Sequence, residues 1–204
     1  MKFKIGCFYT ENTPYKDIYN ESLLPSCKEL NLNISCVESK NYGRWIRNVA
    51  EKPKIIGELL NSIADDERLF FIDVDAKFEQ YPKLLEEIPE DIEIAYHILD
   101  WNLFYGYKDS PPKTELLTGS MLFKPTKKVK ELCKEWYEKS VKDLVWEQKA
   151  LYEIIGKYNL KTYILPLTYV WINSRPGNKP LLIPEKDVVI RHYQASREYK
   201  RKML

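Results

Sequence analysis

The chain has 204 residues, of which 44% are hydrophobic and 30% charged, the usual balance of a globular protein. A chain of this length buries roughly 70% of the surface that it exposes when unfolded, so it needs no disulfide. Its 32 Lys and Arg residues against 30 Asp and Glu residues leave a formal charge of only +2. This balance gives no bulk attraction to nucleic acid or to a membrane.

Glycine is scarce, with 7 residues, whereas aromatic residues reach 13%. The glycines form neither G-x-G-x-x-G nor a Walker loop, and G-x-S-x-G is absent as well. These absences argue against dinucleotide-binding Rossmann enzymes, P-loop NTPases and α/β-hydrolases.

The cysteines and the N-terminus indicate a reducing compartment. The four cysteines show no C-x-x-C pair and no histidine at zinc spacing, so we expect buried, reduced thiols. The N-terminus enters a strand pattern directly, and no window approaches ~18 uninterrupted apolar residues. We therefore predict a cytoplasmic protein without a transmembrane segment.

The first half of the chain alternates between strand and helix patterns. Strands are predicted over 3–9, 32–37 and 69–72, and helices over 15–30 and 53–63. Pro25 interrupts the first helix, whereas Pro53 fits the first turn of the second. A loop carrying residues 42–45 separates the second strand from the second helix. This order predicts an α/β domain with a mainly parallel sheet.

The second half is less regular. Strands are predicted over 92–98, 116–123, 163–167 and 188–192, and helices over 129–137, 144–158 and 195–203. The last of these helices is basic. No internal repeat or linker occurs, so we predict a single domain over 1–204, a mixed, mainly parallel sheet flanked by helices.

Two aspartates follow the most apolar predicted strand. Asp73 and Asp75 come directly after the run 69–72, and on an extended backbone their side chains point to the same side. In parallel sheets, ligands bind at the carboxyl ends of the strands. Two close carboxylates favour a hard divalent cation such as Mg²⁺ or Mn²⁺. The plain alternative is an acidic turn after a strand.

The two histidines have different settings. His192 ends the predicted strand 188–192, where a neutral imidazole would add a nitrogen ligand and favour Mn²⁺. His97 lies within an apolar strand, which favours a structural role. A structural role remains open for His192 too.

Several segments appear in an order typical of one family. They are Phe8-Tyr9-Thr10, Lys52-Pro53, Phe71-Ile72-Asp73-Val74-Asp75, Leu117-Thr118-Gly119-Ser120-Met121-Leu122-Phe123, Glu147-Gln148-Lys149-Ala150-Leu151 and Ile190-Arg191-His192-Tyr193. With them the chain resembles the GT-A class of glycosyltransferases, the nucleotide-diphospho-sugar transferases with a DxD motif. The resemblance spans nearly the whole chain and implies a Rossmann-like GT-A domain. In it, 1–98 would bind the nucleotide and 99–204 the sugar and acceptor.

The resemblance implies how the donor would be held. Asp73 would contact the ribose and the metal, and Asp75 and His192 would ligate the Mn²⁺ or Mg²⁺ that holds the diphosphate. The other donor-binding positions are Tyr9 and Thr10 beside the nucleoside, Val74 between the aspartates, Lys52 near the nucleotide or its phosphates, and Gly119 and Ser120 against the sugar.

Candidates for the chemistry lie in the second half. Glu147 and Gln148 would face the sugar or acceptor, although the family more often has Asp-Gln there. An inverting enzyme needs a general base, for which Glu147 or Asp100 is suited. A retaining enzyme needs none, because the leaving phosphate can take the proton, and the matched segments resemble retaining members slightly more.

The C-terminal stretch from Lys186 has six basic residues against two acidic ones, a local charge of +4. Arg191 and Arg197 are best placed to close over a diphosphate, although a solvated basic helix is the plain alternative. Trp101, in Asp100-Trp101-Asn102, is a candidate stacking surface for a sugar, with core packing as the alternative.

The sequence therefore predicts a metal-dependent glycosyltransferase that moves a hexosyl or pentosyl group from a nucleotide-diphosphate donor. By resemblance the donor is a UDP-sugar, and the acceptor stays open as a glycan, a protein or a modified nucleic acid. Two alternatives stand beside it. One is a metal-dependent nuclease or phosphotransferase that uses Asp73, Asp75 and Asp100. The other is a basic module that binds nucleic acid through the C-terminal helix. The composition is also typical of an AT-rich genome, such as that of a bacterium or its phage.

Overall fold

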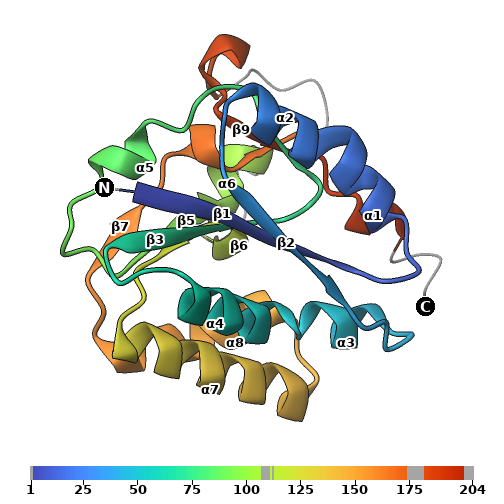
Figure 1. The fold of residues 1–204 in the computed structure, drawn as a ribbon, viewed down its shortest axis with the longest axis vertical. Coiled ribbons are helices and arrows are strands. Elements are labelled where there is room, and N and C mark those ends of the chain that lie inside the picture. Colours follow the sequence, from blue (N-terminus) through green and yellow to red (C-terminus); the bar gives the residue numbers. More distant parts are fainter. Residues whose placement is uncertain (1, 107–110, 112, 174–181, 200–204) are drawn as a thin grey trace.

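A six-stranded sheet, in the order β2-β1-β3-β6-β5-β7, forms the middle layer of the protein (Figure 1). The computed structural model describes residues 2–106, 111, 113–173 and 182–199. The strands are β1 (Lys2–Thr10), β2 (Ile34–Ser39), β3 (Glu67–Ile72), β4 (Ala76–Phe78), β5 (Ile94–Asp100), β6 (Thr114–Phe123), β7 (Thr162–Ile164), β8 (Trp171–Ile172) and β9 (Ile190–His192). The helices are α1 (Tyr15–Ile18), α2 (Leu24–Glu29), α3 (Trp45–Val49), α4 (Lys52–Ser62), α5 (Leu84–Glu87), α6 (Trp101–Tyr105), α7 (Lys127–Asp143), α8 (Glu147–Ile154) and α9 (Ser196–Tyr199).

The pairing within the sheet is mixed. β1 runs parallel to β2 and β3, and β5 runs parallel to β7. β6 is antiparallel to both of its neighbours, β3 and β5. The predicted α/β fold with a mixed, mainly parallel sheet is therefore confirmed.

Helices cover both faces of the sheet. Figure 1 shows α3, α4, α7 and α8 on one side and α1, α2 and α5 on the other. Leu69 and Phe71 of β3 pack into the core beneath α4, α7 and α8, and Phe70 and Ile72 pack into the opposite core. Successive strand side chains point to opposite faces, so a strand buried on both faces is an unbroken apolar run. This explains the run over 69–72.

The short helices α5 and α6 were not predicted. Four further local details differ from the sequence prediction. A π-helical turn over Tyr19–Leu23 joins α1 to α2, so the chain stays helical through Pro25. Proline has no N–H group to donate to the carbonyl four residues before it. The wider π-helical turn that precedes Pro25 accommodates the missing hydrogen bond, so the helix continues. The loop predicted to carry residues 42–45 ends at Arg44, because α3 begins at Trp45. The helix predicted from 144 begins instead at Glu147.

The fourth difference is a small second sheet, in the order β4-β9-β8. Its strands of two or three residues are too short to show a periodic pattern, and only β9 was predicted. The basic helix predicted over 195–203 is described only as α9, and its residues 200–203 lie outside the described part.

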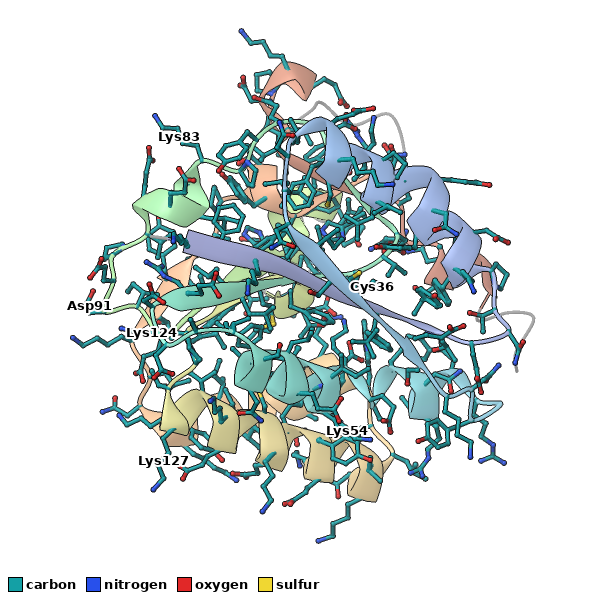
Figure 2. All side chains as sticks on the ribbon, in the orientation of Figure 1. Cys36, Lys54, Lys83, Asp91, Lys124 and Lys127 are labelled. Carbon is teal, nitrogen blue, oxygen red and sulfur yellow. The ribbon has the colours of Figure 1, made fainter. Side chains whose placement is uncertain are left out.

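Most of the described charged side chains lie on the outer surface. Figure 2 shows Lys83, Lys124 and Lys127 pointing away from the ribbon at the periphery. Within the described ranges, no helix is both long and apolar enough to cross a membrane.

The core at β3 should dominate stability. Phe70 is fully buried in the middle of the sheet, so Phe70→Ala is expected to lower the free energy of unfolding by about 3–5 kcal/mol, measured by urea denaturation. Leu103→Ala is the control, because that side chain is 62% exposed. Its effect should stay within about 0.5 kcal/mol, and equal losses in the two variants would contradict this core.

Candidate active site

The aspartate pair lies on the turn that follows β3. The amide of Asp73 donates to the carbonyl of Gly119 on β6 at 2.9 Å, and the carbonyl of Asp73 accepts from the amide of Ala76 at 3.1 Å. These bonds fix the turn between β3 and β4. Asp73 is thereby held at the carboxyl end of the central strand, as predicted.

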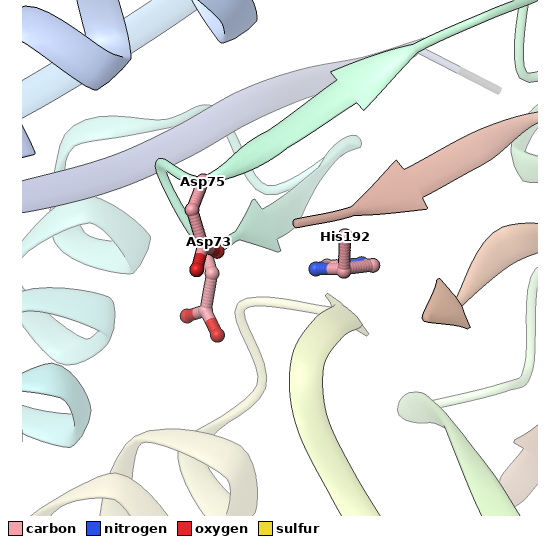
Figure 3. A group of neighbouring side chains, drawn as sticks. All are labelled: Asp73, Asp75 and His192. Carbon is pink, nitrogen blue, oxygen red and sulfur yellow. The ribbon is translucent and has the colours of Figure 1, made fainter. Parts of the chain in front are cut away.

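His192 reaches the aspartates through the small sheet. It ends β9 and pairs in register with Ala76 of β4, immediately after Asp75. One ligand atom from each of Asp73, Asp75 and His192 lies within 4.8 Å of the others, and Figure 3 shows the three side chains converging. The structure thus brings together the three residues predicted to hold a metal.

The cluster is held from behind by further hydrogen bonds. The Oδ2 atom of Asp75 accepts from the amide of Ala195 at 2.7 Å. Ser120 Oγ lies 2.8 Å from His192 Nε2. When that hydroxyl accepts the Nε2 hydrogen, the lone pair of Nδ1 is free for a ligand. A Cβ at Gly119 would lie 3.1 Å from His192 and 3.2 Å from Asp73, so a side chain there would crowd the cluster.

The electrostatics of the cluster fit a divalent cation. Burial and the neighbouring Asp73 raise the pKa of Asp75 to about 6. Burial lowers the pKa of His192 to about 4, so the ring is neutral at neutral pH. A cation between the carboxylates would offset both their repulsion and their desolvation. Two carboxylates and one neutral imidazole form a donor set for Mn²⁺ or Mg²⁺.

A buried ammonium group lies beside the cluster. Lys52 Nζ is 2.8 Å from Asp73 Oδ1 and 3.1 Å from Glu147 Oε1. It also donates to the carbonyl and hydroxyl oxygens of Thr118 at 3.5 and 3.4 Å. Burial lowers the pKa of Lys52, but the two carboxylates outweigh it and raise that pKa above its usual value. Lys52 therefore stays charged inside the protein.

Two pockets meet at the cluster, with volumes of about 130 and 260 Å³. Asp73, Asp75 and Gln148 line both pockets, together with Trp146 and Ser196. The first pocket is further lined by the predicted residues Tyr9, Thr10, Lys52, Val74 and Glu147. The second is further lined by Gly119, His192 and Arg197, and by Trp101.

Three predicted residues do not line either pocket. Ser120 is fully buried behind His192. Asp100 caps α6, its Oδ1 accepting from the amide of Leu103 at 2.9 Å. Arg191 pairs with Glu79 at 2.9 Å and with Glu185, away from the cluster. These positions give no support to the roles expected from the sequence, which were contact with the sugar for Ser120, a general base at the acceptor for Asp100 and contact with the diphosphate for Arg191.

The structure adds two residues for which no role was predicted, Thr118 and Glu115. Thr118 contacts Lys52 and Glu147, and its amide donates to Gln148 Oε1 at 3.3 Å. Glu115 lines the second pocket, and it is the only charged residue in 115–123. A lone charge inside an otherwise uncharged strand was the available signal. Trp45 and Trp146 line the first pocket with ring centroids 6.1 Å apart.

Removing the buried ammonium should destabilise the protein. Lys52→Met leaves the carboxylate of Glu147, 2% exposed, without its cation, so we expect a loss of about 3 kcal/mol in the free energy of unfolding. Lys54→Met is the control two residues along α4. The Lys54 side chain, labelled in Figure 2, is 46% exposed where it pairs with Glu51 at 3.4 Å. Urea unfolding that shows no larger loss for Lys52→Met would contradict the network.

Comparison with solved structures shows the fold to be that of glycosyltransferases. The chain matches a glycosyltransferase involved in the glycosylation of the major capsid of PBCV-1, with a TM-score of 0.69, 15% identity and coverage of 100% of this chain and 99% of the other. It matches the galactosyltransferase LgtC, in complex with donor and acceptor sugar analogs, with a TM-score of 0.55, 16% identity and coverage of 94% and 87%. It matches the glycosyltransferase GlyE of Streptococcus pneumoniae TIGR4 with a TM-score of 0.56, 10% identity and coverage of 96% and 55%.

These matches confirm the GT-A fold expected from the sequence. No curated protein sequence matches the chain. The model of the nucleotide-diphospho-sugar transferase family matches residues 24–204. This range contains the aspartate pair, the buried lysine and His192. The chain therefore belongs to the nucleotide-diphospho-sugar transferase family.

Proposed function

We propose that the protein is a metal-dependent glycosyltransferase that takes a sugar from a UDP-sugar. The observation that carries this proposal is the convergence of Asp73, Asp75 and His192 where two pockets meet, beside the charged Lys52. A bound Mn²⁺ or Mg²⁺ would neutralise charge on the leaving diphosphate. The three side chains would hold it there, and Ser120 would keep the His192 ring in the tautomer that ligates.

The lining of the two pockets supports separate roles for the two halves of the chain. Residues from 1–98 supply most of the lining of the first pocket, and residues from 99–204 supply most of the second. We propose that the first pocket takes the nucleoside, with Tyr9 and Thr10 beside it. The second takes the sugar and the acceptor, with Arg197 placed to meet the phosphates.

We propose that the reaction retains the configuration of the anomeric carbon. Each of the two candidate general bases has one carboxylate oxygen engaged, and the second oxygen of Glu147 is buried. Glu147 Oε1 is bound by Lys52 and by the hydroxyl of Thr118 at 3.1 Å, and Asp100 caps α6. A retaining transfer needs neither, because the leaving phosphate can accept the proton of the acceptor hydroxyl.

The alternative functions have less support. A two-metal nuclease needs further carboxylates, and in the described part of the chain the cluster holds only Asp73, Asp75 and His192. The basic nucleic-acid module is not favoured either, because the family model that matches residues 24–204 is that of the nucleotide-diphospho-sugar transferases. The acceptor remains a glycan, a protein or a modified nucleic acid. The four free cysteines support the predicted cytoplasmic location.

Loss of one metal ligand should remove metal-dependent donor binding. In Asp75→Asn the side-chain oxygen can still accept from Ala195, so the local fold is preserved. We expect the Kd for UDP with Mn²⁺ to rise by more than about 10-fold, since loss of even an outer-shell partner costs 10–100-fold in metal affinity. Calorimetry with and without Mn²⁺ measures it.

The matched control for this variant is Asp91→Asn. Asp91 lies at the periphery in Figure 2, where it pairs with Lys161 at 3.0 Å, so UDP binding should be unchanged. Metal-independent UDP binding by the wild-type chain, or full Mn²⁺ dependence in Asp75→Asn, would refute the assigned site.

The stereochemical outcome can be read without knowing the acceptor. Proton NMR during hydrolysis of an α-linked UDP-sugar should show the α-anomer of the free sugar forming first, before it equilibrates in water. If the β-anomer forms first, the reaction inverts, and a general base must then be sought among the residues of the second pocket.

A further inference from the structure

Glu115 connects two groups that line the second pocket. Its Oε1 accepts a hydrogen bond from Gln148 Nε2, and its Oε2 accepts from Trp101 Nε1 at 2.6 Å. Glu115 itself lies half-buried on β6 and lines the same pocket. One carboxylate therefore serves two donors from two different helices, α6 and α8.

These bonds fix which way the amide of Gln148 points. Gln148 Oε1 accepts from the amide of Thr118 at 3.3 Å, while Nε2 donates to Glu115. Turning the amide by 180° would set its NH2 group against the N–H of Thr118 and its oxygen against the carboxylate of Glu115. Both contacts would be repulsive, so only the observed orientation satisfies both neighbours.

The orientation decides what Gln148 offers to a ligand. Its NH2 group has two hydrogens, of which Glu115 takes one. Gln148 lines both pockets at the metal cluster, so the second hydrogen can reach a group bound between them, whereas the oxygen is turned toward the backbone of β6. Gln148 thus presents a hydrogen-bond donor, not an acceptor or nucleophile.

We propose that Glu115 is a positioning residue for sugar transfer. It orients the Gln148 amide so that the amide donates a hydrogen bond to the donor sugar. Through its second oxygen it also links that amide to Trp101, which lines the second pocket. The inference rests on the proposed glycosyltransferase function and adds a specific role for a residue outside the metal cluster. Glu115 does not line the first pocket, whereas Gln148 lines both pockets. Loss of Glu115 should therefore act mainly on sugar transfer and only weakly on binding of the nucleotide.

Glu115→Gln is the sharpest test, because the new amide has one acceptor oxygen and can serve only one of the two donors. We expect kcat for hydrolysis of a UDP-sugar to fall about 100-fold, the effect of a small misplacement in a site. The most active of UDP-glucose, UDP-galactose and UDP-xylose serves as substrate. The Kd for UDP should change far less than kcat, because Glu115 itself does not line the nucleotide pocket.

A second substitution should rescue the first. In the double variant Glu115→Gln/Trp101→Phe, the indole N–H is gone, so the oxygen of the new amide can accept from Gln148 again. We expect the double variant to hydrolyse the donor faster than Glu115→Gln alone. A wild-type rate in Glu115→Gln, or no gain in the double variant, would overturn the positioning role.

Glu93→Gln is the matched control. Glu93 is also half-buried and also accepts from two donors, Thr126 Oγ1 and the amide of Lys161, each at 3.2 Å. It lines neither pocket. Its hydrolysis rate should equal that of the wild type, and a comparable loss there would reduce the effect at Glu115 to general destabilisation.

The side-chain NH2 signal of Gln148 in NMR tests the geometry without activity. It is assigned by its absence in Gln148→Glu. The chemical shift of this signal should change in Glu115→Gln and return toward the wild-type value in the double variant. An unchanged chemical shift in Glu115→Gln would overturn the inference. If the wild-type chain hydrolyses no UDP-sugar, the proposed function fails, while this measurement still decides the positioning role.

Discussion

The buried ammonium of Lys52 is the interaction on which the site depends. It rises from α4 and is bound by Asp73 after β3, Thr118 on β6 and Glu147 on α8. A charge taken out of water must be paired and hydrogen-bonded, or burial costs several kcal/mol. The need to satisfy this one group therefore brings four elements to a common point. Both pockets open beside that point.

The same constraint bears on the proposed binding of a diphosphate by a chain with few glycines. A glycine loop supplies backbone N–H groups to phosphates, whereas here fixed side-chain charges converge. Asp73 and Asp75 are held so close that burial and mutual repulsion raise the pKa of Asp75 to about 6. That strain is offset when a cation binds between them. Gly119 contributes in another way, because its missing side chain leaves the space that the cluster needs.

The sequence could predict elements whose signal is local. The apolar run 69–72 indicated a strand buried on both faces, and the two aspartates after it followed from strand periodicity. His192 required the resemblance, because only the pairing of β9 with β4 brings it to Asp75. Local reasoning could not foresee that Asp100 would cap α6 or that Arg191 would pair with Glu79 and Glu185. Those partners are determined by how the helices and strands pack against one another, which a local pattern does not show.

The start of α8 shows how one helix can serve both pockets. Consecutive helical residues point roughly 100° apart, so Glu147 and Gln148 face different partners. Glu147 lines the first pocket and binds Lys52, while its carbonyl accepts from Trp136 Nε1 at 2.6 Å. Gln148 lines both pockets and binds Glu115. Any shift of this helix would move the partner of the buried lysine and the amide at the second pocket together. The linings of the two pockets are thus held in a fixed relative position by the first turn of one helix.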